Sequence, residues 1–149
     1  DSTISLDSFF NSEIKRLEKL NPIILKTVIK DADQETKSLK IQNWKNELSG
    51  FIAADITKDL DKSLYSIEEI DCKKIYKAKD KKLDIQLLMI EYHKDGGIRQ
   101  VQIERTIDNT LYTSKEKLKY FTDSIYEIEK VQDIVILGNT TYKISGILK

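Results

Sequence analysis

The feature that most constrains the fold is a change of hydrophobic period near Leu64. After this point apolar and polar residues alternate along short segments, and short polar turns separate the segments. Strands joined by such short connections are antiparallel, because a parallel pair needs a crossover of about a dozen residues. The sequence therefore predicts an antiparallel meander, with expected strands LYSIEEI, CKKIYKA, LDIQLLMIEYH, IRQVQIERTI, NTLYTS, SIYEIEKV, IVIL and TTYKISGIL. The segment KEKLKYFTDS, residues 115–124, is expected to form a short helical turn within it.

The part of the chain before Leu64 has helical spacing in two places. Apolar residues recur at helical intervals from Ser5 to Leu20, where Ser5 can cap the helix and Asn21-Pro22 can end it. In NWKNELSGFIAADI, Asn43 can cap a second helix, whose apolar face would carry Trp44, Leu48, Phe51 and Ile52. Between the helices, ILKTVIK and TKSLKIQ predict a β-hairpin around DADQE.

These elements predict an α+β fold. Its expected order is an N-terminal helix, a β-hairpin and a second helix, followed by a long antiparallel β-meander that can curve into a half-barrel. A chain of 149 residues fits a single domain and buries about two thirds of the surface that its unfolded form exposes. Residues 1–149 are taken as that domain, with the polar residues 1–5 as a tether.

The hairpin from Leu83 to Ile107 decides which side chains share a face of the sheet, because a shift of one residue exchanges the two faces. A three-residue loop with Gly96 in the left-handed conformation is favoured. It pairs Glu91 with Arg99, Met89 with Val101, Leu87 with Ile103 and Leu83 with Ile107. The alternative is a two-residue Asp95-Gly96 turn, which pairs Ile90 with Val101 and Leu88 with Ile103.

The first strand of this hairpin is apolar on both faces, so something is expected to cover the second one. One interpretation is that an amphipathic helix of the same chain packs there. The other is that a curved sheet leaves a trough for a lipid or another apolar ligand. The candidate face for an apolar ligand or a protein partner consists of Leu88, Ile90, Tyr92 and Ile98, with Tyr112 and Tyr126 as rim groups.

The sequence offers little for catalysis or metal binding. His93, the only histidine, lies beside a hairpin tip, and Cys72, the only cysteine, is expected to pack in a strand as a small hydrophobe. DADQETKSLKIQ begins like a calcium loop but lacks its glycine and final glutamate. We therefore predict no catalytic residues, no metal and no cofactor. The alternative is a small hydrolase or isomerase with a buried carboxylate in a cone-like cavity, for which Glu104 is the nearest candidate.

Charge and hydropathy narrow the expected partners. Lys plus Arg equals Asp plus Glu, at 25 each, and the lysine-rich stretch from Lys73 to Lys82 is interleaved with aspartates. Such a stretch predicts a solvated face rather than a nucleic-acid site. No run of about 18 apolar residues occurs, so no membrane span is expected. A protein partner or an apolar small molecule remains the expected ligand.

Four segments carry a resemblance to a known group of proteins: NWKNELSGFIAADI, NTLYTS, YEIEKVQDIVIL and TYKISGIL. Together they make the chain similar, over roughly residues 23–148, to small uncharacterised exported or lipid-anchored envelope proteins of Bacteroidota-type bacteria. The chain departs from them at Glu129-Lys130, where they often have glycine. The resemblance implies a cell-envelope or secreted location, and it carries no activity.

The first residue is Asp1 and not methionine, as is expected where a signal segment has been cleaved. A lipid anchor upstream of Asp1 would fit the same setting. Taken together, these observations predict a non-enzymatic envelope or surface module that binds a protein partner or an apolar ligand on its sheet.

Overall fold

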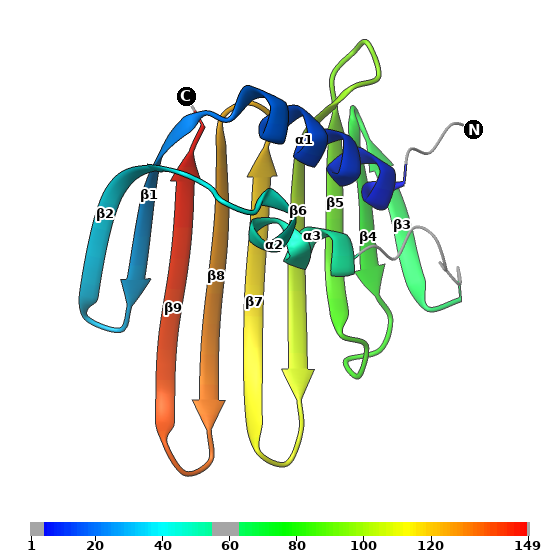
Figure 1. The fold of residues 1–149 in the computed structure, drawn as a ribbon. Helices are drawn as coiled ribbons and strands as arrows, with labels where there is room; N and C mark the ends of the chain where they lie inside the picture. The colour runs from blue at the N-terminus through cyan, green and yellow to red at the C-terminus, as the bar shows by residue number, and fades with distance from the viewer. Residues whose placement is uncertain (1–4, 55–62, 149) are drawn as a thin grey trace.

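The computed structural model describes residues 5–54 and 63–148 and confirms the α+β fold (Figure 1). Nine strands form one open antiparallel sheet in the order β2-β1-β9-β8-β7-β6-β5-β4-β3. The strands are β1 (Ile23–Lys30), β2 (Asp33–Lys40), β3 (Tyr65–Ile70), β4 (Lys73–Ala78), β5 (Ile85–Tyr92), β6 (Ile98–Asp108), β7 (Tyr112–Phe121), β8 (Ile125–Ile134) and β9 (Gly138–Ile147). The helices are α1 (Leu6–Leu20), α2 (Trp44–Glu47) and α3 (Ser49–Ala53).

Helix α1 begins and ends where the sequence predicts. The Ser5 side chain accepts a hydrogen bond from the backbone N–H of Ser8, and Asn21 ends the helix in the left-handed conformation. Of the expected tether, residues 1–4 lie outside the described part of the chain.

The single second helix that the sequence predicts is instead two short ones, α2 and α3, which meet at Leu48. Asn43 caps α2 as expected, accepting from the backbone N–H of Asn46 at 3.0 Å. Gly50 explains how close α3 lies to the sheet, because a Cβ atom there would come within 2.9 Å of the Leu118 side chain in β7. Position 50 is therefore a glycine because of the close packing of α3 against β7.

All three helices lie on the same face of the sheet, which confirms that a helix of the same chain covers it (Figure 1). The Phe10 ring stacks on Phe51 with centroids 4.9 Å apart, and it meets Tyr120 of β7 edge-on at 5.1 Å. These aromatic contacts join α1, α3 and the sheet into one core.

The register of the β5–β6 hairpin differs from the one we favoured. The three-residue loop forms as predicted, since His93 N–H donates to the Gly97 carbonyl and Gly96 has a φ of 99°. Tyr92 then pairs with Ile98, but Glu91 pairs with Gln100, so Arg99 is an extra residue in a β-bulge. Between Leu87 and Glu91 the register is therefore shifted by one, so the favoured pairs of Leu87, Met89 and Glu91 are wrong and the alternative ones form, Ile90 with Val101 and Leu88 with Ile103. A second irregularity restores the favoured register at Ile85, which pairs with Arg105.

Two further expectations about the meander are wrong. Residues 115–124 form no helical turn, because most of them belong to β7, which pairs along its length with β6 and β8. The segment IVIL is not a strand of its own: Ile134 ends β8, Val135–Leu137 form a turn, and β9 begins at Gly138. Consecutive aliphatic residues resemble a buried strand in sequence, and here they occupy a turn.

Cys72 is also not where the sequence places it. It lies with Asp71 in the two-residue turn between β3 and β4 and is exposed. Asp71 has a φ of 54°, a conformation that aspartate tolerates in tight turns. The strand that was expected to bury the cysteine therefore starts one residue later, at Lys73.

The helix-free face of the sheet pairs its own charges. Side chains of opposite sign alternate along a row across four strands, from Glu104 through Lys117 and Glu129 to Lys143. The Lys143 ammonium lies 3.5 Å from Glu129 and 3.7 Å from Glu127. Cross-strand pairs of this kind stabilise an exposed sheet face. Because the signs alternate, this row forms neither a positive nor a negative stripe.

Candidate functional site

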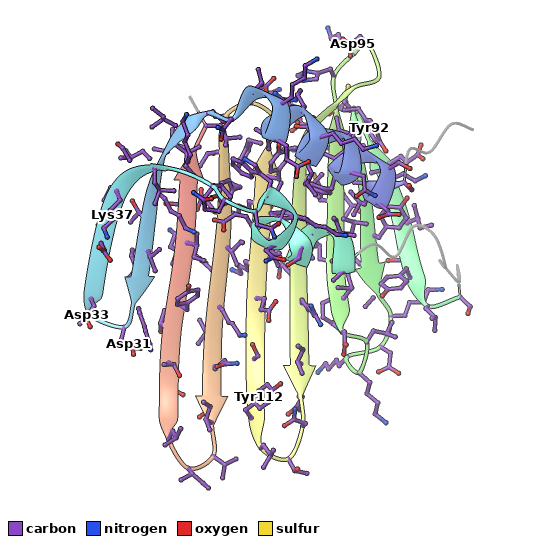
Figure 2. All side chains as sticks on the ribbon, viewed as in Figure 1. Asp31, Asp33, Lys37, Tyr92, Asp95 and Tyr112 are labelled. Carbon is purple, nitrogen blue, oxygen red and sulfur yellow. The ribbon has the colours of Figure 1, made fainter. Side chains whose placement is uncertain are left out.

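The residues of the predicted apolar face lie in different environments. Leu88, Ile90 and Ile98 are buried in the core that the helices complete. Tyr92 is half-buried at one end of the sheet and Tyr112 lies toward the other end (Figure 2). The structure therefore does not bring these residues together on one accessible surface.

Tyr126, the last of the predicted rim groups, is fully buried. Its hydroxyl donates to the Glu47 carboxylate at 2.6 Å, and the Lys26 ammonium contacts the same oxygen at 2.8 Å. Gly146, opposite Tyr126 in β9, leaves room for the ring, because any Cβ atom there would overlap it. Tyr126 thus joins α2 to the sheet.

A second tyrosine–carboxylate pair lies under α1. The Tyr120 hydroxyl donates to Glu13 at 2.7 Å, and Arg16 contacts Glu13 at 2.8 Å and Asp123 at 2.7 Å. Glu13 is only 8 % exposed, so a carboxylate is held inside the helix–sheet interface by one hydroxyl and one guanidinium. Such partners are what a buried carboxylate needs in order to remain charged.

These two tyrosines make stability fall at high pH. Burial, reinforced by the neighbouring glutamate, raises the pKa of Tyr120 and of Tyr126 well above the ordinary value of 10. Both groups stabilise the fold fully below about pH 10, and this contribution is lost as pH rises toward the folded pKa, because the unfolded tyrosine ionises first. We expect each to remove about 1.4 kcal/mol per pH unit in that range. Urea unfolding between about pH 9 and pH 11 measures the slope.

Tyr120→Phe tests the assignment of this slope. The variant should lose about half of the slope that the pair contributes, since phenylalanine has no proton to release. An unchanged slope in Tyr120→Phe would mean that other groups cause the alkaline instability.

The groups considered for catalysis are exposed. Glu104 is exposed on the helix-free face, and His93 is exposed beside the β5–β6 loop. Across the described residues, no group of three or more His, Cys, Asp or Glu side chains is arranged to hold a metal ion. The same residues contain no helix of the length and apolar character that crossing a bilayer requires.

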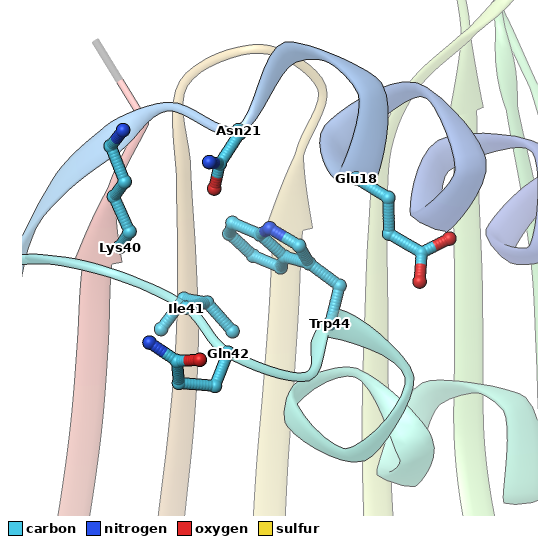
Figure 3. A pocket seen from close by; sticks show the side chains of 6 residues that line it. All are labelled: Glu18, Asn21, Lys40, Ile41, Gln42 and Trp44. Atoms are coloured by element: carbon cyan, nitrogen blue, oxygen red, sulfur yellow. The ribbon is translucent and has the colours of Figure 1, made fainter.

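A pocket of about 350 Å³ lies between the end of α1 and the segment that joins β2 to α2. Its lining comes from two segments of the chain, residues 18–21 and 40–44, which meet only in the fold (Figure 3). The side chains are Glu18 and Asn21 from the end of α1, Lys40 from β2, Ile41 and Gln42 from the connection, and Trp44 from α2. The volume lies in the range of small-molecule sites.

Trp44 forms the inner side of this pocket and is 2 % exposed. Its ring meets Tyr126 edge-on at 6.0 Å, which fixes its position in the core. The indole Nε1–H is buried and has no hydrogen-bond acceptor among the described residues. Figure 3 shows this nitrogen on the side of the ring that faces Asn21. An unpaired buried donor is costly, so this one has a strong preference for an acceptor.

The charged groups of the pocket are also unpaired. Within the part of the chain that the structure describes, neither Glu18 nor Lys40 forms an ion pair. They lie on opposite sides of Trp44 (Figure 3). The pocket thus combines one positive group, one negative group and one buried donor around an aromatic ring.

Comparison of the chain with protein-family models, with curated proteins and with solved structures gives no match. The candidate site therefore stands on its own geometry.

Sequence reasoning missed this pocket. It placed Trp44 correctly on the buried face of a helix, but no sequence pattern shows that an indole N–H will lack a partner. The lysine and the glutamate of the pocket are 22 positions apart in the chain, and only the packing of α1 beside β2 and α2 brings them to one site.

Proposed function

We propose that the protein is a non-enzymatic binding module that takes a small zwitterionic molecule, an amino acid or a short peptide, in the pocket beside Trp44. The buried indole N–H without an acceptor is the observation that carries the proposal. A ligand carboxylate would lie near Lys40 and would accept from this donor once a shift of the lining side chains uncovers the indole nitrogen, while a ligand ammonium would lie toward Glu18. Within the proposal, the setting is the envelope location that the resemblance implies.

A non-enzymatic role is supported by the carboxylates beneath the helices. Both oxygens of Glu13 accept hydrogen bonds, from Tyr120 and Arg16, and one oxygen of Glu47 accepts from Tyr126 and contacts Lys26. A general acid or base needs a free position facing the substrate. Both groups instead connect helices to the sheet.

Trp44 provides the test, because it is the only tryptophan of the chain and its fluorescence reports on the pocket directly. We would add the standard free amino acids and glycylglycine, with acetate and ethylamine as probes that carry only one of the two charges. We expect a saturable change in emission for at least one zwitterion, with a Kd of about 1 mM or lower.

Matched variants separate pocket binding from general effects. Lys40→Met and Glu18→Gln should each weaken binding about tenfold, which corresponds to about 1.4 kcal/mol. Lys37→Met is the control, since Lys37 lies on the same strand but pairs with Glu35 outside the pocket. The proposal is overturned if no zwitterion changes the emission, or if acetate alone binds as tightly as the amino acids.

A further inference from the structure

The four most exposed large hydrophobic side chains in the described part of the chain lie together at one end of the sheet. Leu111 is in the β6–β7 turn, and Val135, Ile136 and Leu137 form the β8–β9 turn, with exposures from 69 % to 89 %. The Val135 N–H donates to the Leu111 carbonyl at 3.1 Å, so the two turns are neighbours. We call these four residues the apolar tip.

The composition of the apolar tip is unusual for turns. Turns are normally built from Gly, Asn, Asp, Pro and Ser, which suit the backbone and interact well with water. The other hairpins of this chain follow that rule, with Asp31-Ala32 between β1 and β2 and Lys94–Gly96 between β5 and β6. A contiguous group of exposed aliphatic side chains on a projecting turn marks a contact surface.

The shape of this end of the sheet suits insertion into a lipid surface. Figure 1 shows the β6–β7 and β8–β9 hairpins side by side, extending past the helices to the far end of the sheet. The tip projects and is not a groove. Its four side chains offer on the order of 400 Å² of apolar surface, about half of what each partner contributes to a standard protein interface. This area is too small for a stable dimer built on the tip alone.

The charges around the apolar tip indicate which kind of lipid surface it would contact. Residues 109–111 and 134–139 carry no charged side chain, and the first charges on the strands that enter the turns are those of Asp108 and Asp133. Asp108 accepts from the Thr113 hydroxyl at 3.0 Å, so it faces the base of the tip. The two charges closest to the tip in sequence are carboxylates, which disfavours an anionic surface, and the first cations on the strands that leave the turns, Lys115 and Lys143, are farther along the strands.

We propose that the apolar tip inserts into the surface of a lipid bilayer that carries no net charge. Aliphatic side chains enter the hydrocarbon boundary while Asp108 and Asp133 remain at the level of the headgroups. The strength should resemble that of a single acyl chain, with an association constant of about 10⁴ M⁻¹, so binding is reversible. The Trp44 pocket takes no part in this contact, and the inference is independent of the proposed ligand.

The first experiment is co-sedimentation of the full chain with phosphatidylcholine vesicles. We expect about half of the protein to sediment at about 0.1 mM lipid, and Ile136→Ser combined with Leu137→Ser to lower the partition coefficient at least about tenfold. Leu25→Ser is the matched control, since Leu25 is an exposed aliphatic residue outside the tip, and it should bind like the original protein. Replacing part of the phosphatidylcholine by phosphatidylserine should weaken binding.

A second measurement places the tip in the bilayer. Ile136→Trp introduces a second, exposed tryptophan beside the buried Trp44 of the original chain. The emission of the introduced tryptophan should shift to the blue when phosphatidylcholine vesicles are added. The proposal is overturned if the original protein stays in the supernatant at about 1 mM lipid, which is about ten times the lipid concentration expected to bind half of it. Binding that increases with phosphatidylserine, or self-association that Ile136→Ser abolishes without any vesicle binding, would likewise overturn it.

Discussion

Phe10→Ala should remove about 3–5 kcal/mol from the free energy of unfolding. Phe10 is fully buried where α1 meets both α3 and the sheet, with Phe51 stacked on one side and Tyr120 edge-on at another. Alanine at this position leaves a cavity that the surrounding rings cannot fill without losing their own contacts. Because single domains are stable by only about 5–15 kcal/mol, the loss is a large share of the total. Urea unfolding followed by circular dichroism measures it.

The neighbouring Phe9 is a matched control for this prediction. It is on the same helix and touches Phe10 and Tyr120, but it is only partly buried. Phe9→Ala should therefore cost less, about 1–2 kcal/mol. Equal losses for the two variants would contradict the way α1 is rotated against the sheet.

Gly146→Val should destabilise the protein by about 3 kcal/mol or more. A side chain at this position overlaps the ring of Tyr126, which is buried and rigidly held. The ring would have to move, and its hydroxyl would lose the hydrogen bond to Glu47 at the helix–sheet interface. Thermal or urea unfolding of the variant measures the loss.

A double-mutant cycle shows whether Tyr126 is the cause. Tyr126→Ala is destabilising by itself, but Gly146→Val made in that background should cost less than about 1 kcal/mol, because the overlapping ring is gone. Gly97→Ala is the control for glycine replacement, since its nearest contact is the ordinary 3.4 Å to Asp95, and we expect about 0.5 kcal/mol or less. Additive losses for positions 126 and 146 would exclude the proposed steric conflict.

The architecture of this protein follows from local sequence signals. Ser5 and Asn21 mark the ends of α1 because capping depends on neighbouring residues, and alternation marks the strands because one face of the sheet is buried. Asn43 marks the start of α2 in the same way. The α+β class and the helix cover could therefore be predicted.

The register and the candidate sites depend on contacts that no local pattern contains. The bulge at Arg99 changes which β6 side chains share a face with Leu88 and Ile90 of β5, even though the loop itself is as predicted. The aliphatic run at residues 134–137 was assigned to a strand because hydrophobic residues are expected inside. The most informative errors of the prediction thus fall at the apolar tip, where the sequence breaks the rule for turns.

The order of the strands in the sheet also determines which part of the fold can form last. β1 pairs on one side with β2, its neighbour in sequence, but on the other side with β9, more than a hundred residues later. Strands β4 to β9 each pair with the preceding strand through short connections, so the part from β3 to β9 can form from local contacts. During synthesis, the first hairpin has no sheet to join until β9 has been made. The first hairpin is therefore among the last of the described elements to reach its native place.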